Sequence, residues 1–156
     1  MKMMELKRLA RTLALSLLFQ SDLSGENPQE TVRLFLACFD PEKDSEGSLK
    51  LSPEDFREAL PLALEFFFGV SENLKTIDDD ISGVLLNWRL ERLSKVDKAL
   101  IRLAYYEMRH REDIPPRVSL NEALELAKDF GDNDSRAFVN GILDKLWHGL
   151  SGDAKP

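Results

Sequence analysis

Apolar residues recur along most of the chain at the three- and four-residue spacing of amphipathic helices, and strand-like alternation is not evident. The first such segment runs from about Lys2 to Leu23, and its apolar face carries Leu6, Leu9, Ala10, Leu13 and Leu17. Similar segments follow to the end of the sequence, with no internal repeat of fixed period. The pattern predicts an all-α bundle of about seven helices.

Helix starts are marked by small polar residues that typically cap the first turn. Asn27 precedes Pro28, and Ser52 precedes Pro53, which places a proline at the first helical position in both cases. Ser94 opens a third segment with Asp97 three residues later, and residues 119–122 read as a complete capping box. The last helix is predicted from about Asp134 to Leu150.

Helix ends are marked by proline and glycine. Asp40-Pro41 and Ile114-Pro115-Pro116 should each stop a helix, and Gly131 stands where a C-cap glycine belongs. Residues 41–51 are predicted to form one long loop. Gly69-Val70-Ser71 should break or kink the helix that begins near Ser52.

The chain has 156 residues, which indicates a single domain over residues 1–150 with a short polar tail, 151–156. Its one cysteine, Cys38, excludes an intramolecular disulfide and a cysteine-rich zinc site. No apolar run approaches the length of about 20 residues that a membrane helix needs, and no secretory signal is evident. We therefore expect a cytoplasmic protein.

Charge is unevenly distributed around a net value of −7. Residues 1–24 and 81–118 carry a basic excess, whereas residues 25–80 are strongly acidic. This balance excludes a uniformly basic nucleic-acid binder but not a local basic patch. A solvated helical surface explains charge runs equally well.

Sequence motifs of common enzymes and metal sites are missing. We find no glycine-rich phosphate loop, nucleophile elbow, HExxH motif or EF-hand loop. Asp78-Asp79-Asp80 resembles a metal-ligand cluster, but consecutive helical residues point about 100° apart and cannot all face one ion. Neither His110 nor His148 has an obvious catalytic partner. These observations predict a protein that is not an enzyme and has no catalytic residues, metal or cofactor.

The first helix carries a basic and aromatic strip. Lys7, Arg8 and Arg11 fall within an arc of about 100°, away from the leucine face. Further along the same side lie Leu15, Leu18 and Phe19. Such a strip could bind single-stranded RNA, with cations on phosphates and Phe19 beside a base. The competing interpretation places Leu15 and Phe19 in the core of the bundle.

Two motifs stand out in the C-terminal third, residues 118–131 (VSLNEALELAKDFG) and residues 138–144 (FVNGILD). Through these motifs the chain resembles the NusB family of bacterial transcription antitermination factors. Residues 96–107 and the opening helix, with Arg8, Ala10, Arg11 and Leu18-Phe19, fit the same family. Residues 25–52 match poorly and look like an expanded segment.

The resemblance implies a fold and a function. The fold would be all-helical, with two small three-helix units forming one compact bundle. The protein would bind the boxA element of ribosomal RNA leader transcripts together with NusE, a small-subunit ribosomal protein. The complex would join the RNA polymerase elongation complex, suppress premature termination and assist ribosomal RNA maturation. The chain could be a monomer or a homodimer.

Site residues follow from the same resemblance, position by position. Those matching the RNA-binding positions are Lys7, Arg8, Arg11, Phe19, Asp134 and Phe138. Asp134 could equally be an N-cap and Phe138 a core aromatic. Glu91 and Asp97 match acidic positions that face NusE, although Asp97 could serve only as a capping residue after Ser94.

Two other functions remain open at this stage. The chain could be a helical scaffold that has lost RNA binding, because Leu9 stands where some family members carry another arginine. It could also be an isolated domain related to the NusB-like domain of ribosomal RNA cytosine methyltransferases.

Overall fold

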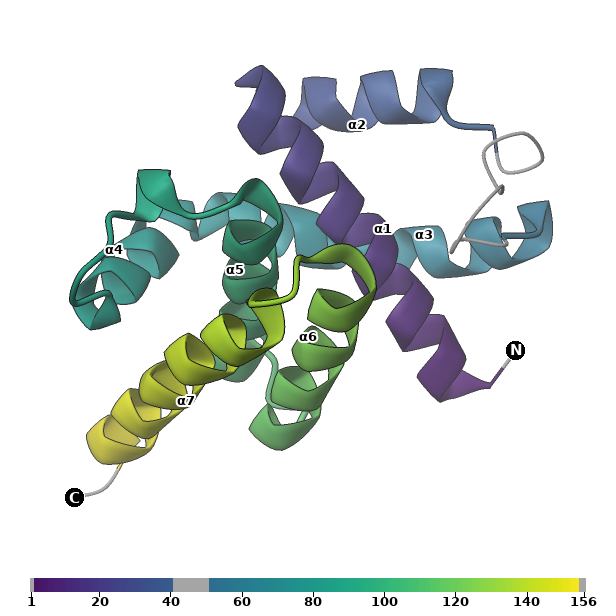
Figure 1. Ribbon diagram of the computed structural model, residues 1–156. Coiled ribbons are helices and arrows are strands. Elements are labelled where there is room, and N and C mark those ends of the chain that lie inside the picture. Colours follow the sequence, from purple (N-terminus) through teal and green to yellow (C-terminus); the bar gives the residue numbers. More distant parts are fainter. Residues whose placement is uncertain (1, 41–50, 155–156) are drawn as a thin grey trace. The chain divides into compact units, whose positions relative to one another are not determined.

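The computed structural model describes residues 2–40 and 51–154. Within these residues the chain is all-α, as predicted, and contains no strand. The elements are α1 (Met3–Ser24), α2 (Pro28–Cys38), α3 (Pro53–Glu72), α4 (Leu74–Val84), the 3₁₀-helix η1 (Leu90–Arg92), α5 (Lys95–His110), α6 (Pro116–Phe130) and α7 (Ser135–Ala154) (Figure 1). Helix α7 therefore includes residues 151–154. The predicted loop at residues 41–51 lies, apart from Leu51, outside the described residues.

The chain divides into two compact units, one up to Phe68 and one from Gly69 onward, so that the boundary falls inside α3. The first unit contains α1, α2 and most of α3, and the second contains the last turn of α3 with α4, η1 and α5–α7. A single domain over residues 1–150 stays a prediction.

In the first unit, α1 packs on α2. The turn between them contains Gly25, whose φ of 73° is left-handed and whose N–H donates to Ser21 O. This conformation carries no steric penalty at glycine. The aromatic rings of Phe35, Phe39 and Phe56 join α2 to the start of α3, with centroids 4.9–6.5 Å apart.

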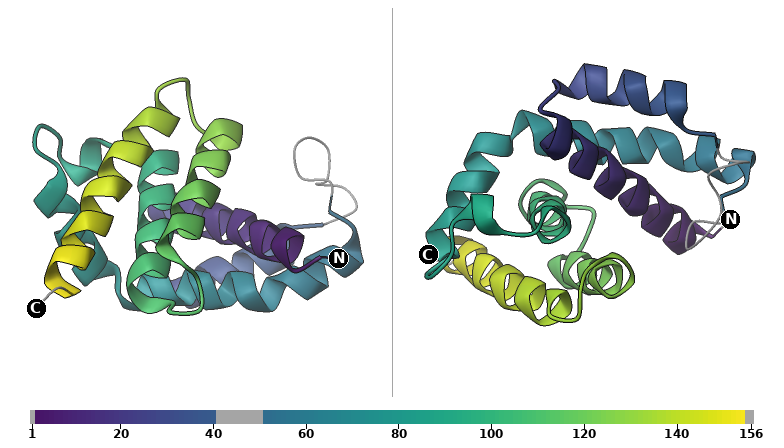
Figure 2. Two further views of the ribbon diagram at one scale, coloured as in Figure 1. Left: turned by 90° about the horizontal axis from the view of Figure 1, so that it is seen from below. Right: turned by 45° about the horizontal axis from the view of Figure 1, so that its top comes forward.

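In the second unit, α5, α6 and α7 each pack on the other two, and α4 packs on α5 and α7 (Figure 2). Helix α5 is buried along most of its length, from Asp97 to Glu107. The unit's fully buried apolar side chains come from several of its helices and include Ile77, Ile81, Leu100, Ile101, Leu103 and Leu143. This burial supplies the main driving force for the unit's folding.

Three of the predicted helix caps are confirmed. Asn27 Oδ1 accepts the Glu30 N–H at 2.8 Å, Ser52 Oγ accepts the Asp55 N–H at 3.1 Å, and Ser94 Oγ accepts the Asp97 N–H at 3.1 Å. The predicted C-cap at Gly131 is also confirmed, because its N–H donates to Ala127 O.

Of the predicted break or kink at Gly69-Val70-Ser71, the break is wrong. Helix α3 continues through Gly69 to Glu72, and the turn to α4 lies at Asn73, whose Nδ2 donates to Gly69 O at 2.8 Å. A Cβ placed on Gly69 would lie 2.3 Å from Tyr106 Cζ. The glycine therefore makes room for a ring rather than ending a helix.

The predicted capping box at residues 119–122 is also wrong. Helix α6 begins one turn earlier, at Pro116. Ser119 is buried in its first turn, and its hydroxyl donates to Glu107 Oε1 of α5 at 3.1 Å. Because α6 has already begun at Pro116, Ser119 lies within the helix rather than at the N-cap position.

The aspartate triplet of α4 contacts three different sets of partners. Asp78 accepts two hydrogen bonds from Arg102, at 2.9 and 2.8 Å, whereas Asp79 pairs with Lys75 at 3.0 Å. Asp80 accepts from Tyr105 Oη at 2.6 Å and pairs with Arg109. In the described part of the chain, no group of three His, Cys, Asp or Glu side chains could hold a metal ion. None of the described helices has the length and apolar character needed to cross a membrane.

Candidate RNA and partner interface

The basic end of α1 presents its three cations differently. Arg8 is exposed, Lys7 is half-buried, and Arg11 is only 2% exposed. The guanidinium of Arg11 lies over the Phe66 ring, 5.8 Å from its centroid, which is cation–π geometry. Arg11 shares the arc of Arg8 but is buried there, and its assignment to the RNA site stays a prediction. Arg11 is buried because α1 is buried around its whole circumference from Ala10 to Leu15.

The apolar continuation of the strip is mostly core. Leu15 and Leu18 are buried, whereas Phe19 is half-buried. The core interpretation therefore holds for the two leucines. Part of the Phe19 ring remains accessible to a ligand.

The connection between α6 and α7 carries the other two predicted RNA contacts. Asp134 is exposed, and its N–H donates to Asp132 Oδ1 at 2.9 Å. Ser135 Oγ accepts the Asp132 N–H at 3.0 Å, which closes the turn. Phe138 is half-buried on the first turn of α7. The hydrogen bonds hold Asp134 on an ordered turn in which its own carboxylate faces solvent.

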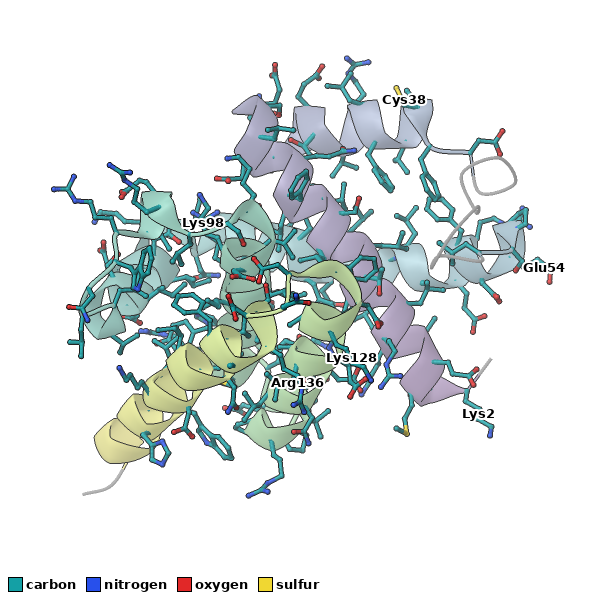
Figure 3. All side chains as sticks on the ribbon, viewed as in Figure 1. Lys2, Cys38, Glu54, Lys98, Lys128 and Arg136 are labelled. Atoms are coloured by element: carbon teal, nitrogen blue, oxygen red, sulfur yellow. The ribbon has the colours of Figure 1, made fainter. Side chains whose placement is uncertain are left out.

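Two exposed cations flank this connection and were missed by the sequence analysis. Lys128 lies near the end of α6 and Arg136 near the start of α7 (Figure 3). The sequence did indicate these two residues, because they stand on either side of the Gly131 turn. That turn brings the ends of two consecutive helices together. Residues on α1 belong to the first unit and those on α6 and α7 to the second.

Of the two acidic residues predicted to face a protein partner, Glu91 is exposed on η1. It lines a cavity of about 550 Å³ together with Ser82, Trp88, Arg89, Leu90 and Arg92. Its carboxylate is therefore available to a basic group outside the chain.

Asp97 is 8% exposed, and its backbone N–H is capped by Ser94. Ser94 therefore caps the helix as predicted, whereas a capping role for the Asp97 side chain stays a prediction. The side chain is a separate matter, because Asp97 Oδ1 is buried and has no hydrogen-bond partner among the described residues. An unsatisfied buried acceptor costs about 1–3 kcal/mol, so a donor that reached this oxygen would gain a hydrogen bond.

Each of the two histidines contacts a residue one turn earlier in its own helix. His110 ends α5 and stacks on Tyr106, with ring centroids 5.4 Å apart. Burial, and secondarily the charge of Arg109, lower the pKa of His110. His148 Nδ1 lies 2.7 Å from the backbone oxygen of Asp144, one turn earlier in α7.

Comparison with known proteins gives consistent matches along nearly the whole chain. The model of the NusB family matches residues 8–147. A transcription antitermination protein NusB from Anaeromyxobacter sp. (strain Fw109-5) is 43% identical over 148 residues, covering 94% of each chain. NusB from T. maritima has 34% sequence identity and a TM-score of 0.71, covering 91% of this chain and 90% of its own. The fold also matches a crystal structure of antitermination factors NusB and NusE in complex with dsRNA, with a TM-score of 0.74, 24% identity and coverage of 94% and 99%.

Proposed function

The chain belongs to the NusB family, and from this we propose that it is an RNA-binding transcription antitermination factor that acts together with NusE. The observation that carries the proposal is the match over residues 8–147, which includes α1, the α4–η1–α5 segment and the α6–α7 connection. Relatives that share this full length are transcription antitermination proteins.

We propose boxA RNA of ribosomal RNA leader transcripts as the ligand, bound without catalysis or cofactor. Exposed Arg8 and half-buried Lys7 would contact phosphates, and the accessible part of Phe19 would pack beside a base. Asp134 and Phe138 would meet the RNA at the second unit, where Lys128 and Arg136 add positive charge. Because Arg11 is buried against Phe66, its role would be to hold α1 in place beneath these contacts.

NusE is the proposed protein partner, by analogy with the related complex of NusB, NusE and dsRNA. Exposed Glu91 offers a carboxylate to a basic partner, and the unsatisfied oxygen of Asp97 offers a buried acceptor. The two proteins and the RNA would act in the cytoplasm on the RNA polymerase elongation complex. Because the chain carries a net charge of −7, its own attraction for a polyanion is weak, and NusE would strengthen it.

The test is a titration of boxA RNA with the purified chain, with and without NusE, at one salt concentration. We expect weak binding alone and much tighter binding with NusE. Arg8→Ala should weaken both titrations, whereas Arg57→Ala removes an exposed arginine of the same unit from α3 and should change neither. Equal affinities with and without NusE would contradict the cooperative mechanism, and absence of binding in both would contradict RNA binding.

A further inference from the structure

The segment between α4 and η1 exposes two large apolar side chains. Leu86 is 80% exposed and Trp88 is 60% exposed. Trp88 is the largest of the side chains exposed in this way within the described residues. Full burial of an aromatic side chain contributes about 1.5–3 kcal/mol, so this surface has a substantial free energy to gain from being covered.

The segment that presents these side chains is anchored on both sides. Ile81 on α4 is fully buried, and Leu90 and Leu93 on either end of η1 are 8% exposed. The 3₁₀ turn is closed by a hydrogen bond from the Arg92 N–H to Arg89 O at 2.9 Å. Trp88 therefore projects from a backbone anchored on both sides, which lowers the cost of ordering this segment when a partner binds.

Charges of both signs surround the exposed tryptophan. Arg89, Glu91 and Arg92 line the same cavity as Trp88, and each of the three is exposed. An apolar centre with a charged rim of both signs is the usual anatomy of a protein–protein interface, where Trp and Arg are enriched. Glu91, which lines the same cavity as Trp88, would repel a phosphate there. Leu86 also cannot stack on a base. The surface therefore fits a protein rather than RNA.

We propose that Leu86 and Trp88 form the apolar anchor of the NusE interface, with Arg89, Glu91 and Arg92 as its rim. This inference rests on the proposed function, since it takes NusE as the partner. Continuity supports that choice, because Glu91, which is assigned to NusE, lines one cavity with Trp88. The surface of NusE that covers the anchor should carry an apolar socket, carboxylates facing Arg89 and Arg92, and a basic group facing Glu91.

The test compares two tryptophan variants, since Trp88 and Trp147 are the chain's two tryptophans. Trp88→Ala should weaken NusE binding at least tenfold, as expected for a central anchor, and leave the melting temperature nearly unchanged. Trp147→Ala is the matched control, since Trp147 is half-buried on α7 beside Arg117, and NusE affinity should stay within twofold of wild type. RNA binding by the chain alone should be unchanged in Trp88→Ala.

A fluorescence experiment tests the same contact without removing it. In Trp147→Phe, Trp88 is the chain's sole tryptophan. Its emission should move to shorter wavelength when NusE is added, after subtraction of the emission of NusE itself, because the indole leaves water. An emission that does not move would overturn the proposal, as would unchanged NusE affinity in Trp88→Ala.

The outcomes separate this inference from the proposed function. If wild-type chain and Trp88→Ala bind NusE equally well, the proposed function stands and the anchor is wrong. If Trp88→Ala binds NusE normally but no longer binds RNA, the surface is an RNA site and the anchor is again wrong. If wild-type chain does not bind NusE at all, both proposals fail.

Discussion

The Tyr106 ring occupies the space in front of Gly69, where a Cβ would lie 2.3 Å from both Tyr106 Cζ and its hydroxyl oxygen. Gly69→Ala should therefore lower the free energy of unfolding by about 1–3 kcal/mol, because the buried ring must move. Gly141→Ala is the matched control in a helix interior with open space around it, and it should raise stability by about 0.5–1 kcal/mol. Urea unfolding measures both, and two substitutions of the same sign would contradict the steric role of Tyr106.

Asp78 and Arg102 form a two-bond ion pair whose side chains are 24% and 10% exposed. Arg102→Met keeps the aliphatic stem but leaves the carboxylate without its charged donor, and it should cost about 1.5–3 kcal/mol. Lys75→Met breaks the exposed pair with Asp79 and should cost less than about 0.5 kcal/mol. Chemical denaturation of the two variants compares them, and similar losses would mean that the buried geometry adds nothing.

We expect Arg8 to contact RNA and Arg11 to stabilise the fold, so their alanine variants should differ. Arg8→Ala should make the slope of log K for RNA against log salt less negative by about 0.7, with little change in melting temperature. Arg11→Ala should lower stability by about 1–3 kcal/mol, because it removes a buried side chain that packs on Phe66. Salt-dependent titrations and thermal melts of both variants give the answer. A stable Arg11→Ala variant with a flattened slope would return Arg11 to the RNA site.

Variants of Asp97 and Ser94 should distinguish a residue that binds the partner from one that caps the helix. Asp97→Asn keeps the backbone N–H that Ser94 caps, removes the charge and replaces one acceptor oxygen by an NH2 donor. We expect NusE affinity to fall several-fold, more at low salt, with little loss of stability. Ser94→Ala removes the cap and should cost about 0.5–2 kcal/mol while the folded protein binds NusE normally. If Asp97→Asn loses stability and its folded fraction binds normally, Asp97 serves the helix alone.

His110 should make the fold sensitive to mild acid. Its pKa in the folded state is lowered, mainly by burial, so the unfolded chain binds the proton more tightly. The stabilisation is therefore present above the ordinary histidine pKa of about 6.5 and is lost as the pH falls through the lower folded value. His110→Gln should reduce the loss of stability between pH 7.5 and 5.5. Proton NMR titration checks the direction, with His148→Gln to assign the signals of the two histidines. A folded pKa at or above the ordinary value would reverse this expectation.

The features that were predicted correctly from the sequence depend on residues close together in the chain. The caps at Asn27, Ser52 and Ser94 each join a side chain to a backbone N–H three residues later, so the tetrapeptide contains the whole interaction. The helical segments likewise follow from the spacing of apolar residues. The family was recognisable from motifs in α6 and α7 for the same reason, since each lies within one short stretch.

The features that were predicted wrongly depend on distant partners. Ser119 has the local sequence of a cap, but α6 begins earlier, at Pro116, and the hydroxyl donates to Glu107, twelve residues away. Gly69 looks like a helix breaker until the ring of Tyr106 is placed against it. The burial of Arg11 was likewise not evident from its spacing on α1, because Phe66 lies under its guanidinium. In each case a contact between separate helices overrides the local pattern.

Two members of the aspartate triplet of α4 fix the rotation of that helix about its own axis. Asp78 contacts Arg102, and Asp80 contacts Tyr105 and Arg109, all on α5, whereas Asp79 pairs with Lys75 of α4 itself and keeps that pair in any rotation. A shift of α4 by one residue would turn the helix by about 100° and still place a carboxylate at two of the three angular positions. The apolar positions of Ile77 and Ile81 would then turn out of the core, so the shifted register keeps part of its ion pairing and loses its packing. The number of residues in the turn at Asn73 should therefore matter more than their identity. One residue inserted or deleted there would prevent α4 from keeping both its charge pairing and its hydrophobic burial.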